Sequence, residues 1–193
     1  MRTMQRIGIL GGTFNPIHIG HLAIAQMAKE KVGLDKVIFV PAFIPPHKTV
    51  THLADAKDRL AMVRLAIADN SSFAVSDYEI KKGGRSFSID TVRHFRAIYA
   101  GKAKLYFIIG GDSLATLPTW RKIDKLLKLV TFIAVNRPGY KKIPKVIKHI
   151  AVESELNISS SDLRKWVIQG KTIKYLVPDK VIRYIEQHKI YRE

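Results

Sequence analysis

The chain has 193 residues, of which 47% are hydrophobic, and this length and composition suit one domain with a complete core over residues 1–193. It contains no cysteine, which excludes a disulfide framework and a thiolate metal site. Lys and Arg number 33 against 16 Asp and Glu, so the formal net charge of +17 favours anionic ligands, whether nucleotides or nucleic acid.

The first predicted element is a buried strand over residues 7–10, followed by a glycine corner at Gly11 and Gly12. Glycine lets the backbone turn sharply and lie close to a ligand, because no side chain blocks the approach. Pro16 disfavours helix at the residue before it. We therefore predict a helix only after this proline, with apolar residues at helical spacing from Ile19 onward.

Two histidines, His18 and His21, lie three residues apart at the start of this helix and so share one face. Backbone N–H groups, the positive end of the helix dipole and two imidazole donors together make a phosphate site. The alternatives are a solvated pair or half of a zinc site. Zinc would need a third protein ligand, and neither alternative explains the glycines and proline beside the pair.

A second apolar strand is predicted over residues 36–40, at the separation that a βαβ crossover requires. The loop after it, AFIPPHK, lies at the carboxyl end of the strand, where open α/β sheets bind ligands. Lys48 in this loop is a mobile cation that suits a phosphate, although a single loop lysine is usually just solvated.

Residues 55–68 are predicted as an amphipathic helix and residues 73–75 as a third strand. After a glycine turn, Ser86 or Ser88 can cap the next helix and leave backbone N–H groups for an anion. An ordinary capped helix accounts for Ser88 equally well.

A fourth buried strand over residues 105–109 runs into Gly110, Asp112 and Ser113. An aspartate in this place suits a ligand hydroxyl or an outer-sphere magnesium contact, and equally a helix N-cap. Trp120 follows, and its flat apolar face suits stacking on a flat ligand ring. Tryptophan is more often a core residue than a ligand platform.

A fifth strand over residues 131–135 ends at NRPG, where Arg137 suits a phosphate, an adenine ring or simply a surface carboxylate. Farther on, the hydroxyls of Ser159, Ser160 and Ser161 precede a helix and, with its N–H groups, make a second anion site. Arg164 lies one turn into that helix and faces the same way. The last predicted element is an amphipathic helix in VIRYIEQHKIY.

The alternation of strands and helices predicts an α/β, Rossmann-like open parallel sheet with helices on both faces and a small C-terminal helical extension. No apolar run approaches a membrane span, and the first residues lack the apolar region of a signal peptide. We therefore expect a soluble, cytoplasmic protein.

The run GGTFNPIHIGH resembles the HxGH motif of the adenylyltransferase superfamily of nucleotidyltransferases, and its TFNP portion, with Thr13, Phe14 and Asn15, is similar to the nicotinate mononucleotide branch. SFSIDT resembles the SYTxDT element of that branch, with Phe87 for Tyr and Ser88 for Thr. The likeness extends over nearly the whole chain. It includes GGDSL followed by LPTW, the PPHK loop, ISSSDLR with Ser161 for Thr, and the C-terminal tail.

This resemblance implies adenylyl transfer from ATP to nicotinate mononucleotide, giving nicotinate adenine dinucleotide (deamido-NAD) and pyrophosphate. It implies that SFSIDT holds the pyridine carboxylate, that Trp120 stacks on the base, and that the serine run binds ATP phosphates. Mg²⁺ would come with ATP, bound mainly by its oxygens and water. The predicted catalytic residues are His18, His21, Lys48 and Arg164, and the predicted substrate-binding residues are Gly11, Gly12, Thr13, Phe14, Asn15, Ser88, Thr91, Gly110, Asp112, Ser113, Trp120, Arg137, Ser159, Ser160 and Ser161.

Two alternatives remain open at this point. A sister enzyme acting on nicotinamide mononucleotide or phosphopantetheine would keep HxGH but lack the SFSIDT and LPTW pair. A non-enzymatic basic module that binds nucleic acid would explain the charge, but the chain has no helix-turn-helix or RNP-like pattern, and both phosphate sites would be unexplained. We expect no nucleic acid or membrane partner, and the sequence leaves a homodimer open.

Overall fold

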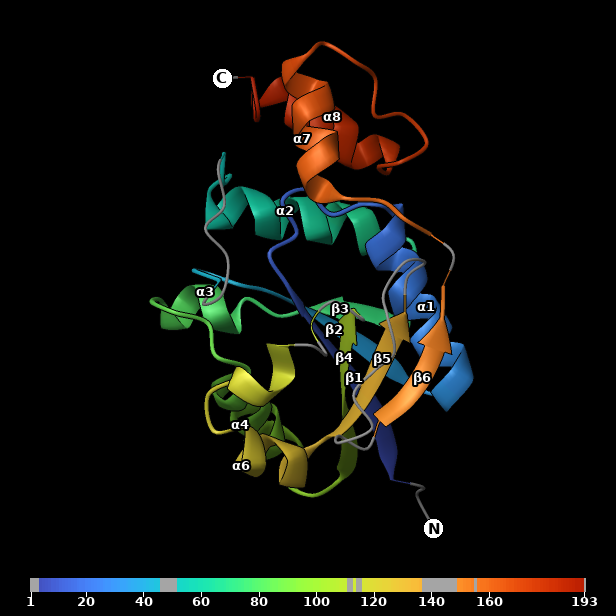
Figure 1. Cartoon of the computed structure of the whole chain (residues 1–193), viewed down its shortest axis with the longest axis vertical. Coiled ribbons are helices and arrows are strands. Elements are labelled where there is room, and N and C mark those ends of the chain that lie inside the picture. The colour runs from blue at the N-terminus through green and yellow to red at the C-terminus, as the bar shows by residue number, and fades with distance from the viewer. Residues whose placement is uncertain are drawn as a thin grey trace.

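A parallel six-stranded sheet forms the centre of the computed structural model, which describes residues 4–45, 52–110, 113, 116–136, 149–154 and 156–192 (Figure 1). The strands lie in the order β3-β2-β1-β4-β5-β6, and every neighbouring pair is parallel. Their bounds are β1 Gln5–Gly12, β2 Lys36–Pro41, β3 Phe73–Val75, β4 Ala103–Gly110, β5 Thr131–Asn136 and β6 His149–Glu153.

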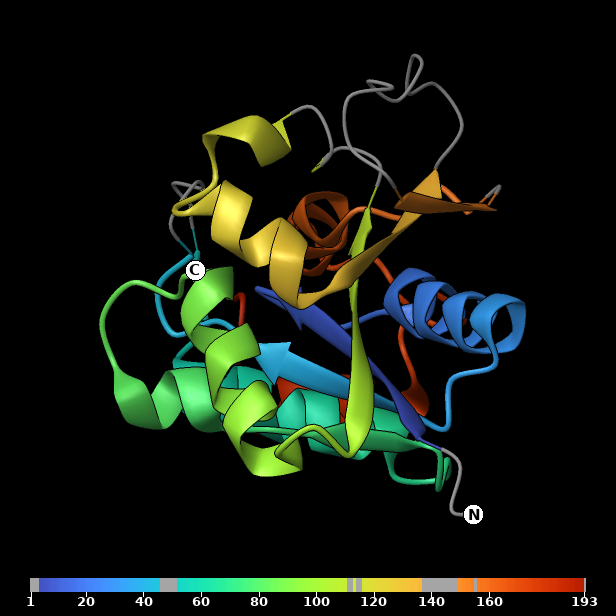
Figure 2. The same cartoon turned by 90° about the horizontal axis from the view of Figure 1, so that it is seen from below.

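Helices cover both faces of this sheet, as Figures 1 and 2 show. One face packs on α1, α2 and the C-terminal helices α7 and α8, and the other packs on α4 and α6. The bounds are α1 Ile19–Val32, α2 Ala56–Ile67, α3 Tyr78–Lys82, α4 Ser88–Tyr99, the 3₁₀ turn η1 Leu117–Thr119, α6 Ile123–Leu129, α7 Ser160–Ile168 and α8 Asp179–Gln187.

Alternation along β1 decides which residues meet which helices. Ile7 and Ile9 are buried on the face of α4 and α6, whereas Leu10 is buried on the face of α1 and α2. Gly8 shares the face of Leu10, and a Cβ atom built on it would lie 2.7 Å from Leu34 Cδ1. A larger residue at this position would therefore require the Leu34 side chain, in the turn between α1 and β2, to shift.

The predicted α/β class, with an open parallel sheet and helices on both faces, is confirmed. All five predicted strands are present, and α1 begins at Ile19, directly after the proline loop. The prediction missed β6, which pairs with β5 at the edge of the sheet, and the short helix α3. It also extended the last helix to Tyr191, whereas α8 ends at Gln187 and the following residues fold back against the core.

The C-terminal helices α7 and α8 lie at one end of the molecule, and α8 packs against α2 (Figure 1). Two polar contacts join α8 to the α2 region: Lys180 Nζ lies 2.8 Å from Asp69 Oδ1, and the Tyr184 hydroxyl donates to Asp58 Oδ1 at 2.9 Å. Val181 and Ile185 of α8 are buried in the same core as Met62 and Val63 of α2. The C-terminal extension is thus packed into the core beside α2.

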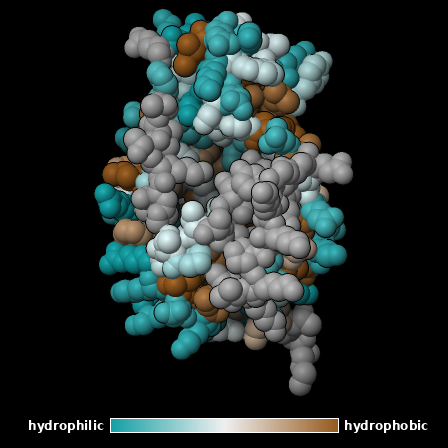
Figure 3. Space-filling view, in the orientation of Figure 1, coloured by the Kyte–Doolittle hydropathy of each residue, from teal (hydrophilic) through white to brown (hydrophobic). Residues whose placement is uncertain are grey.

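On the face seen in Figure 3, hydrophobic residues form small separate areas between hydrophilic ones. Within the described ranges, none of the helices has both the length and the apolar character needed to cross a bilayer.

Candidate active site

Two adjoining cavities open at the carboxyl ends of β1 and β4, the neighbouring strands from which the sheet is wound in opposite directions. This is the place where ligands bind in open α/β sheets. The cavities share a wall made of Gly11, Gly12, Thr13, Gly110 and Ser113. We call one the imidazole cavity, of about 330 Å³, and the other the aromatic cavity, of about 200 Å³.

The imidazole cavity lies between the N-terminal ends of α1 and α7. It joins the glycine corner to the serine run, which the sequence suggested as two separate anion sites. The residues that line it are Leu10, Gly11, Gly12, Thr13, Phe14, Asn15, His18, His21, Ile24, Gly110, Ser113, Asn157, Ile158, Ser159, Ser160, Ser161 and Arg164. Two helix ends with positive partial charge therefore face one space, an arrangement that favours a polyanion.

His18 and His21 lie side by side as predicted, with ring centroids 3.8 Å apart. The backbone N–H of His18 donates to Nδ1 of His21 at 3.3 Å. Since Nδ1 accepts a hydrogen bond, the neutral His21 ring carries its proton on Nε2 and acts there as a donor. The two rings differ in exposure, because His18 is 1% exposed whereas His21 is half-buried.

Phe14 lies beneath His21 and orients it. The two rings meet edge to face with centroids 5.1 Å apart, and Phe14 is 1% exposed. A Cβ atom built on Gly12 would lie 2.8 Å from the Phe14 ring. Gly12 thus leaves room for this buried ring, while a Cβ atom on Gly11 would make only an ordinary contact of 3.5 Å with Phe107. The Phe14 side chain supports the site from within the core.

Helix α7 is fixed to the loop before α1 by two hydrogen bonds. Ser160 Oγ donates to the Pro16 carbonyl at 3.0 Å, and Arg164 Nη1 donates to the Asn15 carbonyl at 2.8 Å. Arg164 Nη2 also donates to Ser161 Oγ at 3.3 Å. Burial lowers the pKa of Arg164, which is 7% exposed. Arg164 therefore joins the two helix ends as well as lining the cavity between them.

The Asn15 side chain makes three hydrogen bonds inside the protein. Its Nδ2 donates to the His52 carbonyl at 3.1 Å, and its Oδ1 accepts from the Ala54 N–H at 3.0 Å and from the Tyr191 hydroxyl at 2.7 Å. The residue is 1% exposed. Its side chain thus holds the loop in place within the wall of the imidazole cavity, and the substrate contact that the motif implied stays a prediction.

Arg59 of α2 supports the loops of the site without lining either cavity, and the sequence gave no reason to select it. Its guanidinium is 1% exposed and donates to four backbone carbonyls, those of Thr13 at 2.8 Å, Ala42 at 2.6 Å, Phe43 at 3.0 Å and Ala54 at 3.0 Å. One cation therefore fixes the glycine-corner loop against the loop after β2. Burial lowers its pKa.

The aromatic cavity is lined mainly by ring and small side chains. Trp120 packs edge to face on Phe107, with centroids 6.0 Å apart, and on Phe132 at 6.4 Å. Ser88 is the first residue of α4 and lines the cavity as predicted. The lining residues are Gly11, Gly12, Thr13, Ala42, Pro45, Glu79, Ser86, Phe87, Ser88, Phe107, Ile109, Gly110, Ser113, Thr116, Trp120 and Arg121.

Thr91 differs from its predicted place, because it is buried behind the aromatic cavity and does not line it. Its hydroxyl donates to Glu79 Oε1. Glu79 itself lines the cavity, is 7% exposed and was not predicted. Burial raises the pKa of Glu79, while hydrogen bonds from the Thr91 and Ser86 hydroxyls act in the opposite direction.

Three predicted site residues, Lys48, Asp112 and Arg137, lie outside the described residues. Gly110 and Ser113, two positions before and one position after Asp112 in the sequence, lie in the wall between the two cavities. Among the described residues, no group of three or more His, Cys, Asp or Glu could hold a metal ion.

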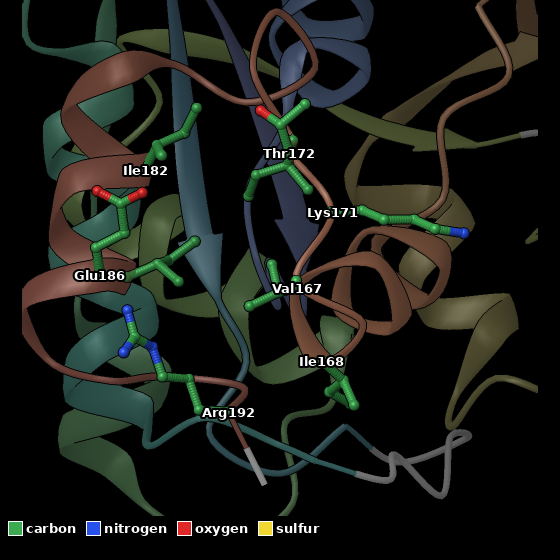
Figure 4. Close-up of a pocket in the computed structure, with 10 residues that line it drawn as sticks. Val167, Ile168, Lys171, Thr172, Ile182, Glu186 and Arg192 are labelled. Atoms are coloured by element: carbon green, nitrogen blue, oxygen red, sulfur yellow. The ribbon is translucent and has the colours of Figure 1, made fainter.

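A larger cavity of about 540 Å³ lies elsewhere, between the end of α7 and α8 (Figure 4). Val167 and Ile168 line it from α7, Ile182 and Glu186 from α8, and the Lys171 side chain points away from α8. None of the predicted site residues lines it. We therefore take the two cavities at the sheet edge as the candidate active site.

Residues 9–166 match the model of the cytidylyltransferase-like family. The chain belongs to this family. A relative from Thermoanaerobacter sp. (strain X514), named probable nicotinate-nucleotide adenylyltransferase, is 44% identical, with all of this chain and 97% of the relative covered. A relative of the same name from Shouchella clausii (strain KSM-K16) is 45% identical, with 97% of both chains covered.

Solved structures agree with this family assignment at the level of the fold. The chain is similar to Plasmodium falciparum nicotinic acid mononucleotide adenylyltransferase, at 22% identity and a TM-score of 0.81 for its complex with NaAD. For the complex of that protein with APC the values are 21% and 0.78, and each comparison covers 97% of both chains. The resemblance drawn from the HxGH run is confirmed by the family model and the named relatives.

Proposed function

We propose that this member of the cytidylyltransferase-like family transfers the adenylyl group of ATP to nicotinate mononucleotide, giving nicotinate adenine dinucleotide and pyrophosphate. The observation that carries the proposal is the pair of cavities that meet at the glycine corner, one suited to a polyanion and the other to a flat ring. The names of relatives at 44% and 45% identity support the same reaction.

The imidazole cavity would hold the triphosphate. The N-terminal ends of α1 and α7 supply backbone N–H groups and positive partial charge, and His21 supplies a donor at Nε2. Arg164 adds a fixed cation at the junction of the two helices. Such donors are already in place before reaction, so they stabilise the charge that develops on the leaving pyrophosphate.

The nucleophile would be an oxygen of the acceptor phosphate. This group is largely dianionic at neutral pH, since its second pKa is near 6, as for other phosphate monoesters, so attack needs no general base. The acceptor oxygen forms a bond to the α-phosphorus of ATP as the bond to the β-phosphate oxygen breaks, and the electron pair leaves with pyrophosphate. The shared wall would hold the two phosphates in line, so that catalysis rests on position and charge.

In the aromatic cavity, Trp120 would stack on the pyridine ring, and Ser88 at the start of α4 would lie near the ring carboxylate. Nucleotidyltransferases of this kind generally use a divalent metal. We propose Mg²⁺, bound to the oxygens of ATP and to water, where it would neutralise phosphate charge. We keep three predictions: single-domain organisation over residues 1–193, a cytoplasmic location and a lack of nucleic acid partners. A homodimer stays open.

The test is pyrophosphate release from ATP with nicotinate mononucleotide, nicotinamide mononucleotide and phosphopantetheine as separate acceptors. We expect turnover with nicotinate mononucleotide and much slower turnover with the other two. A preference for either of the others would assign the chain to a sister activity. Lack of turnover with any acceptor would favour the basic binding module.

A further inference from the structure

We propose that Arg121 determines the preference for the acid form of the acceptor over the amide form, by presenting its guanidinium to the carboxylate on the pyridine ring. This inference rests on the proposed function and extends it to a residue outside the predicted site.

The first argument is the position of Arg121 beside Trp120 in the aromatic cavity. Its guanidinium carbon lies 4.6 Å from the centroid of the Phe87 ring, and both side chains line the cavity. Phe87 directly precedes α4, and α4 packs against α6, which begins two residues after Arg121 (Figure 2). A ring stacked on Trp120 would therefore have the guanidinium near its edge, on the side where α4 begins.

The second argument is charge. Two of the described residues that line the aromatic cavity have side chains of the acidic or basic type, Arg121 and Glu79. Glu79 is buried and accepts hydrogen bonds from Thr91 and Ser86, and Lys82 and Asp90 form an ion pair of 3.4 Å close to it. An ionised Glu79 would repel a carboxylate. Arg121 is the group in this cavity that attracts one.

The third argument is the chemistry of the two acceptors, which differ only in the ring substituent. A carboxylate accepts two hydrogen bonds from a guanidinium in a fork geometry. A carboxamide has no charge and only one oxygen, so the same geometry would place its NH₂ donor against the cation. Because Arg121 is exposed, water weakens this attraction. We therefore expect a contribution of about tenfold in relative kcat/KM, the lower end for a charge-assisted contact.

The experiment measures kcat/KM for nicotinate mononucleotide and for nicotinamide mononucleotide with wild-type protein, Arg121→Gln and Arg121→Lys. In Arg121→Gln the acid-to-amide ratio should fall about tenfold, through a higher KM for the acid, with the KM for ATP unchanged. Arg121→Lys should recover part of the ratio because it keeps the charge. Lys125→Gln is the matched control, since it removes a surface cation of α6 that does not line the cavity.

Three outcomes would overturn the inference. An equal loss for both acceptors would mean that Arg121 contacts a part that they share, such as the phosphate. An unchanged ratio in Arg121→Gln, or an equal fall in Lys125→Gln, would mean that no specific contact exists. Wild-type protein inactive with both acceptors would overturn the proposed function and this inference together, whereas an active enzyme with an unchanged ratio overturns the inference alone.

Discussion

The two halves of the candidate site are built in opposite ways. The imidazole cavity is formed by helix ends, hydroxyls, two imidazoles and a guanidinium, and no acidic side chain lines it among the described residues. The aromatic cavity is formed by Phe87, Phe107 and Trp120, and it contains the buried carboxyl group of Glu79. The two meet at the glycine corner after β1.

This contrast indicates how one site distinguishes two phosphorylated substrates. Fixed dipoles and donors hold negative charge wherever it lies on a flexible triphosphate, whereas a flat slot holds a ring by its shape. A substitution in one half should therefore affect one substrate and leave the other nearly unchanged. The following predictions test this separation, from the largest expected effect to the smallest.

His21→Ala should lower kcat by about a hundredfold or more, the usual cost of one donor that stabilises developing charge. The loss should fall on turnover because the proposed donor at His21 would act on the triphosphate, with the KM for the acceptor little changed. Steady-state pyrophosphate release measures both constants. Thermal unfolding at the wild-type temperature would show that the fold is intact, and an active, folded variant would contradict the role given to His21.

Trp120→Ala should raise the KM for the mononucleotide by about tenfold, from the loss of one stacked ring, with a much smaller change for ATP. The control is Trp166→Ala on α7, because Trp166 is 39% exposed and lines neither cavity. Initial rates with each substrate varied in turn separate the two KM values. Equal increases for both substrates would show that the Trp120 ring only supports the core.

Glu79→Gln should change how stability depends on pH. Burial raises the pKa of Glu79 in the folded protein, so the folded state binds more protons than the unfolded state between the ordinary pKa and the raised one. Stability should therefore fall as pH rises through that interval and stay constant above it. Urea unfolding at several pH values should show this fall in wild-type protein and a flatter profile in Glu79→Gln. The same dependence of the free energy of unfolding on pH in both proteins would refute the prediction.

Tyr191→Phe should have the smallest effect, a loss of about 1 kcal/mol in the free energy of unfolding for one buried hydrogen bond. Asn15 Oδ1 loses the donor at 2.7 Å but keeps the Ala54 N–H. We expect kcat to fall a few-fold, because the loop before α1 carries the imidazoles. Urea unfolding and initial rates measure the two effects. Tyr175→Phe is the control, since Tyr175 is 82% exposed. Equal stability and equal kcat in Tyr191→Phe and Tyr175→Phe would contradict the prediction.

The parts of the site that could be predicted are those formed by residues close together in the sequence. The strand, glycine corner and His18–His21 pair follow from local backbone rules, and the structure has the two rings 3.8 Å apart. Arg59 could not be found in this way. In the sequence it is one more basic residue on an amphipathic helix, and its four carbonyl partners lie on segments that only the fold brings together.

Other differences have the same physical origin. Glu79 lies in a short charged segment that looks solvated, and its burial depends on α4, whose Thr91 turns inward to meet it. Strand β6 was missed because His149–Glu153 is short and mixed in polarity, and pairing with β5 decides its conformation. The two predicted anion sites form one cavity because Pro16 and Asn15 contact α7. Their partners, Ser160 and Arg164, lie 144 and 149 positions farther along the chain.

The bond between Tyr191 and Asn15 has a consequence for how the protein is made. A ribosome synthesises Asn15 early and Tyr191 176 positions later, so a partly made chain can assemble β1 and its neighbours while this loop still lacks one of its anchors. The loop before α1 therefore gains this anchor only after the last residues of the chain have left the ribosome.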